Sequence, residues 1–336
     1  MSIRTAIIGY GTGGRVFHAP LVDATDGLEV SHIVTANAER SRAAAGRYPQ
    51  ASIHSSVDDL FSAGGFDLVV VTSPNETHVP YAQRAVDAGI AVVLDKPLAT
   101  NVESARALVE RAEAAGVPLT VFQNRRWDGD FLTVRALISE GALGDIHQFD
   151  SAFEWWSPKL SDRWKDTATP EDGGGILFDL GPHLIDQALV LFGDVVSVHG
   201  ELDNRRGGGA DDDAFVSMTH ANGVRTRLWM SAIAPSNRPR FRVVGSAGVF
   251  EFSGLDPQEP QSIAGMRPTD AGFGVHQDGR AATVRRPDGV VEEVELQAGR
   301  HLSFYERVAS SLTRGGAIPV DPRDSIRGLE VIRAVR

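Results

Sequence analysis

The chain has 336 residues, of which 42% are hydrophobic and 23% charged, and its formal net charge at pH 7 is -11. This length and composition are those of a soluble protein with two full hydrophobic cores, and they exclude a disordered chain. The acidic balance argues against nucleic acid or an anionic membrane as a partner, and the absence of cysteine excludes disulfides and thiol catalysis. The first residues lead into a strand without an apolar signal region, and no stretch reaches a membrane-spanning length, so the cytoplasm is the expected location.

Residues 1–124 alternate short apolar strands with amphipathic helices, which is the pattern of a parallel doubly wound sheet. Right-handed crossovers place the carboxyl ends of the strands on one edge of the sheet, where ligands bind in such folds. We therefore expect a ligand-binding domain that ends near residue 124. The expected strands are residues 5–8, 28–34, 68–72, 91–94 and 119–122, and the expected helices are residues 15–24, 38–47, 78–88 and 102–115.

Residues 125–336 change to a strand pattern after one helix near residues 131–140. They predict an α+β domain built on a large, mostly antiparallel open sheet. One face of this sheet would be covered by helices and the other by a second subunit, because a broad apolar face is rarely left in water. A homodimer or homotetramer is therefore expected. The expected strands are residues 149–155, 195–201, 214–220, 225–231, 240–245, 249–253, 283–286 and 290–296.

Three segments of the second half have weaker patterns. Residues 257–279 show little periodicity and predict a long loop. A helical pattern at residues 323–335 reaches the final residue without a cap, as expected of a chain cut short there. The aspartates at 211–213 follow three glycines and predict a solvated loop rather than a cation site, and no cluster of His, Asp and Glu has the spacing of a metal site.

Residues 9–14 read Gly-Tyr-Gly-Thr-Gly-Gly and fit the pattern G-x-G-x-x-G between an expected strand and an expected helix. Glycines permit a tight turn and the close approach of backbone to a pyrophosphate, while the helix offers free N–H groups and a positive dipole end. In this context the motif predicts dinucleotide binding by a Rossmann domain, and a plain glycine-rich turn is the alternative. The residues expected to contact the cofactor here are Gly9, Gly11, Thr12, Gly13 and Gly14.

The end of the second strand indicates which dinucleotide is bound. An acid there would bond the ribose 2′-hydroxyl of NAD, but the chain has Thr35, Ala36 and Asn37. The missing carboxylate, together with Arg40 and Arg42 in the next helix, favours NADP. NAD remains the alternative, because Asn37 could bond a plain ribose and both arginines could simply be solvated.

Polar residues also follow the other strands at this edge of the sheet. Hydroxyls and a helix start after the strand at 68–72 would line the other side of the cofactor, although Pro74 is equally typical of an ordinary turn. The further residues expected to contact the cofactor are Thr35, Thr72, Ser73, Pro74, Asn75, His78, Asp95, Lys96 and Asn124.

Lys96 is one of only three lysines, with Lys159 and Lys165, although Lys and Arg together number 33. An ammonium is a compact donor whose pKa shifts with its environment, whereas arginine stays charged at any working pH. Lys96 ends an apolar strand and precedes Pro97, which places it at the ligand-binding edge. The pattern indicates a catalytic lysine, and a surface lysine after a strand is the alternative.

The segment at 173–186 is a second candidate site, in which three glycines precede Asp179, His183 and Asp186. Asp179 and His183 are four residues apart, so on a helix, even one bent at the Gly-Pro pair between them, they share a face. An unshifted histidine titrates near pH ~6.5, which suits the transfer of a hydroxyl proton. Asp186 would orient the imidazole or cap a turn. The alternative is a capping aspartate beside a structural histidine.

Aromatic and basic residues near the start of the second domain are the remaining candidates. Trp155, Trp156 and Trp164 could stack on a nicotinamide or a polyol ring, although such residues are more often core and at least one is expected there. Arg125 and Arg126 could help to bind cofactor or substrate, or lie on the surface at a domain boundary.

These motifs together resemble the Gfo/Idh/MocA oxidoreductase family over nearly the whole chain. The glycine loop matches, residues 95–97 stand in place of the family's Glu-Lys-Pro, and Asp179 and His183 lie in its D-x-G-x-H-x-x-D signature. Residues 16–21 and 124–132 resemble the subgroup of NADP-dependent scyllo-inositol dehydrogenases. Two positions depart from the pattern: Asp95 is one methylene shorter than the usual Glu, and Ala36 replaces an arginine that NADP-using relatives tend to carry.

The resemblance implies an NAD(P)-dependent dehydrogenase that acts on a secondary alcohol of a polyol or sugar. It implies that His183 is the general base in oxidation, that Lys96 stabilises the developing alkoxide, and that Asp179 holds substrate hydroxyls and orients the base. Lys96 is the alternative base if burial lowers its pKa far enough. The same fold also hosts NAD-dependent glycosidases and cofactor-sensing regulators without catalysis, which remain alternatives.

Overall fold

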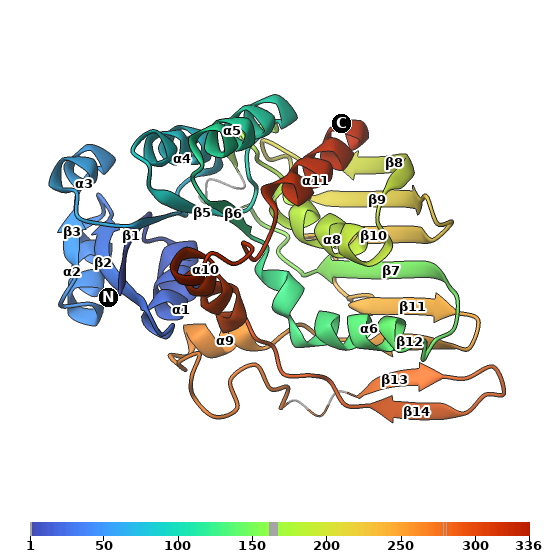
Figure 1. The fold of residues 1–336 in the computed structure, drawn as a ribbon. Helices are drawn as coiled ribbons and strands as arrows, with labels where there is room; N and C mark the ends of the chain where they lie inside the picture. The colour runs from blue at the N-terminus through green and yellow to red at the C-terminus, as the bar shows by residue number, and fades with distance from the viewer. Residues whose placement is uncertain (1, 161–166, 278, 280) are drawn as a thin grey trace. The chain divides into compact units, whose positions relative to one another are not determined.

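The computed structural model describes residues 2–160, 167–277, 279 and 281–336 (Figure 1), so Trp164 and Lys165 lie outside the described residues. The chain forms two compact units. The first contains residues 1–124, 258–273 and 300–326, and the second contains residues 125–257, 274–299 and 327–336. The sequence-based boundary at residue 124 assigns the two later segments of the first unit to the second domain instead.

A six-stranded parallel sheet forms the centre of the first unit (Figure 1). Its strands are β1 (Ile3–Ile8), β2 (Leu28–Val34), β3 (Ser52–His54), β4 (Leu68–Val71), β5 (Ala91–Asp95) and β6 (Leu119–Phe122). The order β3-β2-β1-β4-β5-β6 reverses direction between β1 and β4, so the carboxyl ends of these two strands form the switch point where ligands bind in such sheets. β4 is apolar and fully buried, as expected of a central parallel strand. The predicted Rossmann fold is confirmed.

Helices cover both faces of this sheet, as a doubly wound fold requires. Figure 1 shows α4 and α5 together on one side and α1 on the other. The short strand β3 and helix α3 were not predicted. The helical elements between the strands are η1 (Gly13–His18), α1 (Ala19–Asp23), α2 (Ala38–Arg47), α3 (Val57–Ala63), η2 (Asn75–Thr77), α4 (His78–Asp87) and α5 (Val102–Ala115).

Two helices from the second half of the sequence belong to the first unit. The helix α9 (Gln258–Ile263) lies in the segment that was predicted to be a loop, so that prediction is wrong there. The helix α10 (Leu302–Arg314) packs against α1. After α10, the chain runs along β6, where Thr120 Oγ1 donates to the carbonyl oxygen of Val320 at 2.8 Å. The last helix, α11 (Pro322–Val335), follows.

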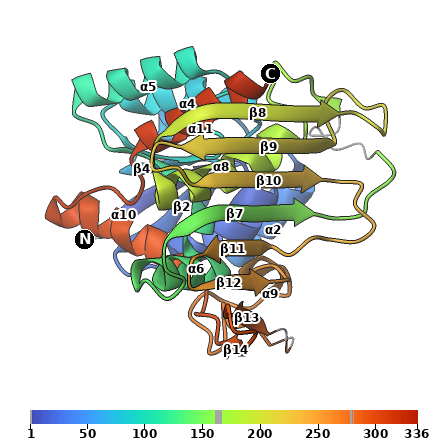
Figure 2. The ribbon, with the colours of Figure 1, turned by 90° about the vertical axis from the view of Figure 1, so that its right-hand side faces the viewer.

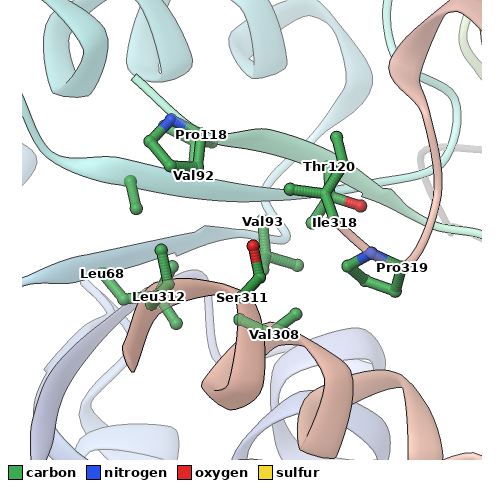
Figure 3. Close-up of a pocket in the computed structure, with 11 residues that line it drawn as sticks. Leu68, Val92, Val93, Pro118, Thr120, Val308, Ser311, Leu312, Ile318 and Pro319 are labelled. Atoms are coloured by element: carbon green, nitrogen blue, oxygen red, sulfur yellow. The ribbon is translucent and has the colours of Figure 1, made fainter. Parts of the chain in front are cut away.

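A small apolar pocket lies between the parallel sheet and α10 (Figure 3). Leu68 and Val92 contribute to it from the amino-terminal parts of β4 and β5, and Val308, Leu312 and Ile318 contribute from α10 and the segment after it. The pocket is therefore near the sheet edge opposite the glycine loop, and it is not the cofactor site.

An eight-stranded sheet forms the second unit, in the order β14-β13-β12-β11-β7-β10-β9-β8. All neighbouring strands are antiparallel except β7 and β10, which confirms the predicted mostly antiparallel open sheet. The strands are β7 (Ile146–Glu154), β8 (Val195–Asp203), β9 (Asp213–His220), β10 (Arg225–Ser231), β11 (Phe241–Gly245), β12 (Gly248–Phe252), β13 (Ala282–Arg285) and β14 (Val291–Val294).

The helices α6 (Gly129–Ser139) and α8 (Ile176–Phe192) of this unit lie on the same face of the sheet, behind it in Figure 2. Side chains on that face, such as Phe149, Val216 and Leu228, are completely buried. The alternate side chains point to the opposite face of the sheet and are partly exposed, among them Trp229 and Arg227. None of the helices in the described residues combines the length and apolar character needed to cross a membrane.

A buried acidic group lies at the start of α6. Asp130 is completely buried, and its Oδ2 atom is 3.9 Å from Nε of the buried Arg240. Burial raises the pKa of Asp130 to about 7, against the opposing charge of Arg240 and with help from the carboxylates of Asp128 and Asp256. This carboxyl group therefore titrates near neutral pH in the folded protein.

Candidate active site

Three glycines of the loop after β1 are required by close packing. Gly9 has a φ of +105°, and a Cβ there would lie 2.5 Å from the carbonyl oxygen of Thr72 at the end of β4. A Cβ at Gly13 would fall closer than 3.0 Å to Thr72 Oγ1, and a Cβ at Gly14 would fall closer than 3.0 Å to the carbonyl oxygen of Gly9. The loop therefore folds tightly onto the end of β4 only because these positions have no side chain.

Gly11 differs from the other three glycines because it has open space beside it. The nearest atom to a Cβ at Gly11 would be Nη1 of Arg40, at 3.8 Å. No other atom of the described residues lies within 4 Å of that position, apart from the chain neighbours. Packing thus leaves room beside the backbone at Gly11, which is the space that a pyrophosphate needs in order to reach backbone N–H groups. The loop fits a dinucleotide.

Residues 35–37 after β2 include no carboxylate, and the guanidinium of Arg40 follows in α2. Asn37 caps α2, because its Oδ1 atom accepts a hydrogen bond from the backbone N–H of Arg40 at 2.9 Å. Thr35 supports the turn, since its hydroxyl oxygen accepts from the N–H of Asn37 at 3.4 Å. The Arg40 side chain reaches back towards Gly11. A positive charge therefore lies beside the glycine loop.

Residues after β4 form a compact turn that is joined to the end of β5. The hydroxyl groups of Ser73 and Thr77 are 2.6 Å apart, and Thr77 also donates to the carbonyl oxygen of Pro74 at 2.7 Å. His78 lies between the two strand ends, with Nε2 at 2.9 Å from the carbonyl oxygen of Ser73 and Nδ1 at 2.8 Å from that of Pro97. Burial lowers the pKa of His78, and the nearby Asp95 carboxylate opposes that shift.

Asp95 ends β5 directly beneath the glycine loop. Its Oδ2 atom accepts from Thr72 Oγ1 at 3.1 Å and lies 3.4 Å from His18 Nε2, while Oδ1 accepts from the backbone N–H of Lys96 at 2.8 Å. Burial raises the pKa of this carboxyl group, but its interactions with His18 and with the positive charge of Lys96 outweigh burial and hold the pKa well below its usual range. Asp95 is therefore ionised, and a cis peptide bond joins Lys96 to Pro97 after it.

The second candidate site lies on α8. The helix runs through its internal Gly-Pro pair, so Asp179 and His183 lie one turn apart on one helix, as predicted. His183 is almost fully buried, with 6% of its surface exposed, and Asp179 is half-buried. The helix begins at Ile176, after the N-cap residue Gly175, and the carboxylate of Asp211 accepts from the backbone N–H of Leu177 at 2.7 Å. A side chain distant in sequence thus caps the helix that carries these residues.

The aspartates at 211–213 do not form a solvated loop, so that prediction was wrong. Asp211 caps α8, as described above. Asp212 has 1% of its surface exposed and accepts from the backbone N–H groups of Arg205 and Arg206 at 2.9 and 2.7 Å. Asp213 is the first residue of β9. The first two carboxylates are buried because each satisfies backbone N–H groups that would otherwise have no acceptor.

Arg125 and Arg126 are largely buried rather than on the surface. The Arg125 guanidinium lies 4.8 Å from the centre of the Phe153 ring and donates to Asp128 at 3.2 Å. Arg126 makes a two-bond ion pair with Asp186, through Nε at 2.7 Å and Nη2 at 2.6 Å. Both oxygens of Asp186 thus accept from Arg126, which anchors α8 to the start of the second unit.

The two predicted tryptophans within the described residues are not core. Trp155 is half-buried, with its ring edge-on to Phe153, and Trp156 has 57% of its surface exposed. Asn75 and Asn124, which were predicted to contact the cofactor, are largely buried.

The structure divides the predicted site residues between the two units. The first unit brings together the glycine loop, the turn after β4, and Asp95 with Lys96. The second unit holds Asp179 and His183 on α8, beside the Arg126–Asp186 pair. Sequence reasoning did not assign a role to His18, which faces Asp95, and no local pattern distinguishes this histidine from a core residue.

Comparison with known proteins agrees with this arrangement. Residues 3–123 match the oxidoreductase family with an NAD-binding Rossmann fold, and residues 131–251 match the GFO/IDH/MocA C-terminal domain. The chain is 36% identical over 332 residues to the uncharacterized oxidoreductase YdgJ of Escherichia coli (strain K12), covering 98% of this chain and 94% of YdgJ.

A curated relative and a solved structure, both from Bacillus subtilis, are similar to this chain over nearly its whole length. The scyllo-inositol 2-dehydrogenase (NADP(+)) IolW (strain 168) is 33% identical over 339 residues, which cover 99% of this chain and 92% of IolW. The solved structure of yvaA superimposes with a TM-score of 0.92 at 31% identity, covering 99% of this chain and 95% of yvaA. With both halves matched in sequence and fold, the chain belongs to the Gfo/Idh/MocA family of oxidoreductases.

Proposed function

We propose that this protein transfers hydride between a nicotinamide dinucleotide and a secondary alcohol of a polyol or sugar. The observation that carries the proposal is the contact between the glycine loop and the end of β5. A Cβ at Gly13 would lie 3.0 Å from Asp95 Oδ2, so the strand end that presents Lys96 adjoins the loop that fits the dinucleotide. The similarity to IolW supports an inositol-like substrate.

Each of three side chains has a role in this reaction. The nicotinamide supplies or accepts the hydride when it is bound. Lys96, next to the ionised Asp95, donates a hydrogen bond as an ammonium and stabilises negative charge on the substrate oxygen. His183 takes the hydroxyl proton in oxidation and returns it in reduction. Asp179, one helical turn away, holds substrate hydroxyls and orients the base.

Turnover with a panel of inositols and aldoses, measured through the absorbance of the reduced cofactor, tests these roles. We expect Lys96→Ala and His183→Ala each to lower kcat by about 100-fold or more, a typical contribution of proton transfer or charge stabilisation. Lys159→Ala is the matched control, because this lysine is exposed, and it should retain full activity. A variant at position 96 or 183 with unchanged rates would remove that residue from the mechanism.

The same assay distinguishes the two rival activities. A glycosidase that oxidises and reduces its cofactor within one cycle would release sugar with no net change in absorbance. A regulator would bind the dinucleotide and turn over nothing. A double-mutant cycle adds a further check, because two groups that act on one substrate oxygen have non-additive effects. Independent, additive losses at positions 96 and 183 would contradict the shared role.

We propose that NADP is the preferred cofactor. The support is the position of Arg40, whose Nη1 atom lies 3.8 Å from the Cβ position of Gly11, and the absence of an acid after β2. A guanidinium suits a phosphate, because it can donate two parallel hydrogen bonds. The name of IolW, as an NADP(+)-dependent enzyme, agrees with this choice. Titration with both dinucleotides tests it, and tighter binding of NAD would refute it.

We further propose that a second copy of the chain covers the open face of the eight-stranded sheet. Trp229 and Phe215 lie on this face as a ring pair, 5.3 Å between centroids, and Arg238 lies 5.0 Å from the Trp229 ring. Around them, Arg227 forms an ion pair with Asp150 at 2.9 Å. Aromatic and arginine side chains are the residues that homomeric interfaces favour, so a homodimer or homotetramer is expected.

A further inference from the structure

His18 is a completely buried histidine that lies between Asp95 and Tyr305. Its Nδ1 atom is 2.6 Å from the Tyr305 hydroxyl, and its Nε2 atom is 3.4 Å from Asp95 Oδ2. The imidazole also packs on Phe122, with 4.3 Å between ring centroids. Tyr305, on α10, is completely buried as well. A polar line of three side chains therefore runs from α10 through η1 to the end of β5.

One distribution of protons is consistent with the contacts along this line. Burial raises the pKa of Tyr305 well above its usual value, so its hydroxyl stays protonated and donates to Nδ1 of His18. The remaining ring nitrogen, Nε2, then carries the hydrogen and lies 3.4 Å from Asp95 Oδ2, which is an electrostatic contact rather than a well-aligned hydrogen bond. Thr72 donates to the same oxygen. His18 and Thr72 thus both face one partly buried anion, Asp95.

We propose that His18 and Tyr305 are positioning residues that act through Asp95, holding its carboxylate fixed and ionised so that it keeps the Lys96 ammonium in place at the end of β5. The inference rests on the proposed role of Lys96 as the charge that stabilises the substrate oxygen. Asp95 Oδ1 accepts the backbone N–H of Lys96, so the carboxylate also holds the backbone from which that side chain extends.

The charges around Asp95 indicate what would follow from loss of the line. The titratable groups that face it are His18 from η1, Lys96 next in the chain, His78 from α4, and Tyr305 from α10. Burial by itself would raise the pKa of the carboxyl group. Without the His18 donor, protonation of Asp95 would therefore move towards working pH and would remove the negative charge beside Lys96.

The pH dependence of kcat/KM tests the proposal. His18→Phe keeps a ring against Phe122 but has no donor, and we expect it to lose activity at acid pH, about tenfold for each pH unit below the new pKa of Asp95. His18→Gln, whose amide N–H can replace Nε2–H, should restore most of the profile. His220→Phe removes a buried histidine of the second unit, and as the matched control it should leave the profile unchanged.

Tyr305→Phe tests the proposal if the variants at His18 do not fold. It removes only the hydroxyl group, so the imidazole keeps its place and loses the donor that fixes its tautomer. We expect a smaller shift of the acid limb in the same direction. The proposal would be overturned if every folded variant at positions 18 and 305 had the same pH profile as the wild type.

A second measurement does not depend on turnover. The chain has three lysines, so ¹³C labelling of lysine gives three Cε signals, and Lys96→Arg assigns the signal of Lys96. We expect Asp95→Asn to lower the titration midpoint of Lys96 by about one pH unit or more, because a neighbouring anion is lost. The Lys96 signal of His18→Phe should also show an additional step at acid pH as Asp95 titrates.

The two measurements separate the inference from the proposed function. The expected lysine titrations without turnover on any substrate would support the positioning role and count against dehydrogenation. If the enzyme turns over substrate but the titration of Lys96 is the same in all variants at positions 18, 95 and 305, the positioning role is refuted and the proposed dehydrogenation is not affected.

Discussion

Substitutions of two glycines in one loop should separate cofactor binding from packing. A methyl group at Gly13 would clash with Thr72 Oγ1 and approach Asp95 Oδ2 at 3.0 Å, whereas a methyl group at Gly11 would meet only the flexible end of Arg40 at 3.8 Å. Overpacking of this kind costs about 1–3 kcal/mol, so Gly13→Ala should lower the free energy of unfolding by that amount. Gly11→Ala should change it by less than about 1 kcal/mol.

Cofactor affinity should fall in both variants. The methyl group at position 11 would occupy the space through which a pyrophosphate reaches the backbone, and loss of one charge-assisted hydrogen bond costs about 1.5–3 kcal/mol, roughly 10- to 100-fold in Kd. Titration with NADP and urea denaturation measure the two quantities. Gly46→Ala is the matched control, since no atom lies within 4 Å of its Cβ position, and it should bind normally. Wild-type affinity in Gly11→Ala would refute the assignment of this loop to the pyrophosphate.

Three further predictions concern the cofactor, stability and assembly. Arg40→Ala should weaken NADP binding by about tenfold or more and leave NAD binding unchanged, while Arg42→Ala changes neither, as measured by titration. The pKa of Asp130 is about 7 in the folded protein and 3.8 ordinarily, so the folded state binds the extra proton between these values and its stability falls as pH rises through them. Asp130→Asn should abolish this fall, which urea denaturation between pH 4 and 7.5 would detect. Trp229→Glu places a charge on the open sheet face and should yield monomers in analytical ultracentrifugation, and an unchanged assembly would exclude that face as the interface.

The parallel sheet was predictable because three of its strands, β4, β5 and β6, are almost entirely apolar and buried. The predicted bounds of β2 and β6 are those of the structure, and the other predicted strands of this sheet differ by one or two residues. The strand β3 has three residues, which is too short to show a period. The helix α10 has a clear apolar face, with Phe304, Tyr305 and Val308 buried, but its pattern was overlooked. No local pattern shows that it packs in the first unit, because that contact joins residues far apart in the sequence.

The candidate site was predictable where its chemistry is carried by adjacent residues, and not where it depends on distant ones. The glycine loop and Lys96 are recognisable from position alone. The contact of His18 with Tyr305 spans 287 residues, and that of Arg126 with Asp186 spans 60. The aspartates at 211–213 were misjudged for the same reason. A run of like charges after glycines predicts solvent exposure. The sequence does not show which backbone N–H groups donate to those carboxylates and so allow them to be buried.

The packing of Gly13 gives the glycine motif a second purpose. A side chain at position 13 would enter the space filled by Thr72 Oγ1 and Asp95 Oδ2, which are themselves joined by a hydrogen bond of 3.1 Å. The loop that fits the dinucleotide and the carboxylate that holds Lys96 are thus packed against one another in the same unit. Because Gly13 has no side chain, it leaves room for the Asp95 carboxylate. The glycine loop and the strand end that carries Lys96 therefore share one contact, with Thr72 and Asp95 on one side and the glycine backbone on the other.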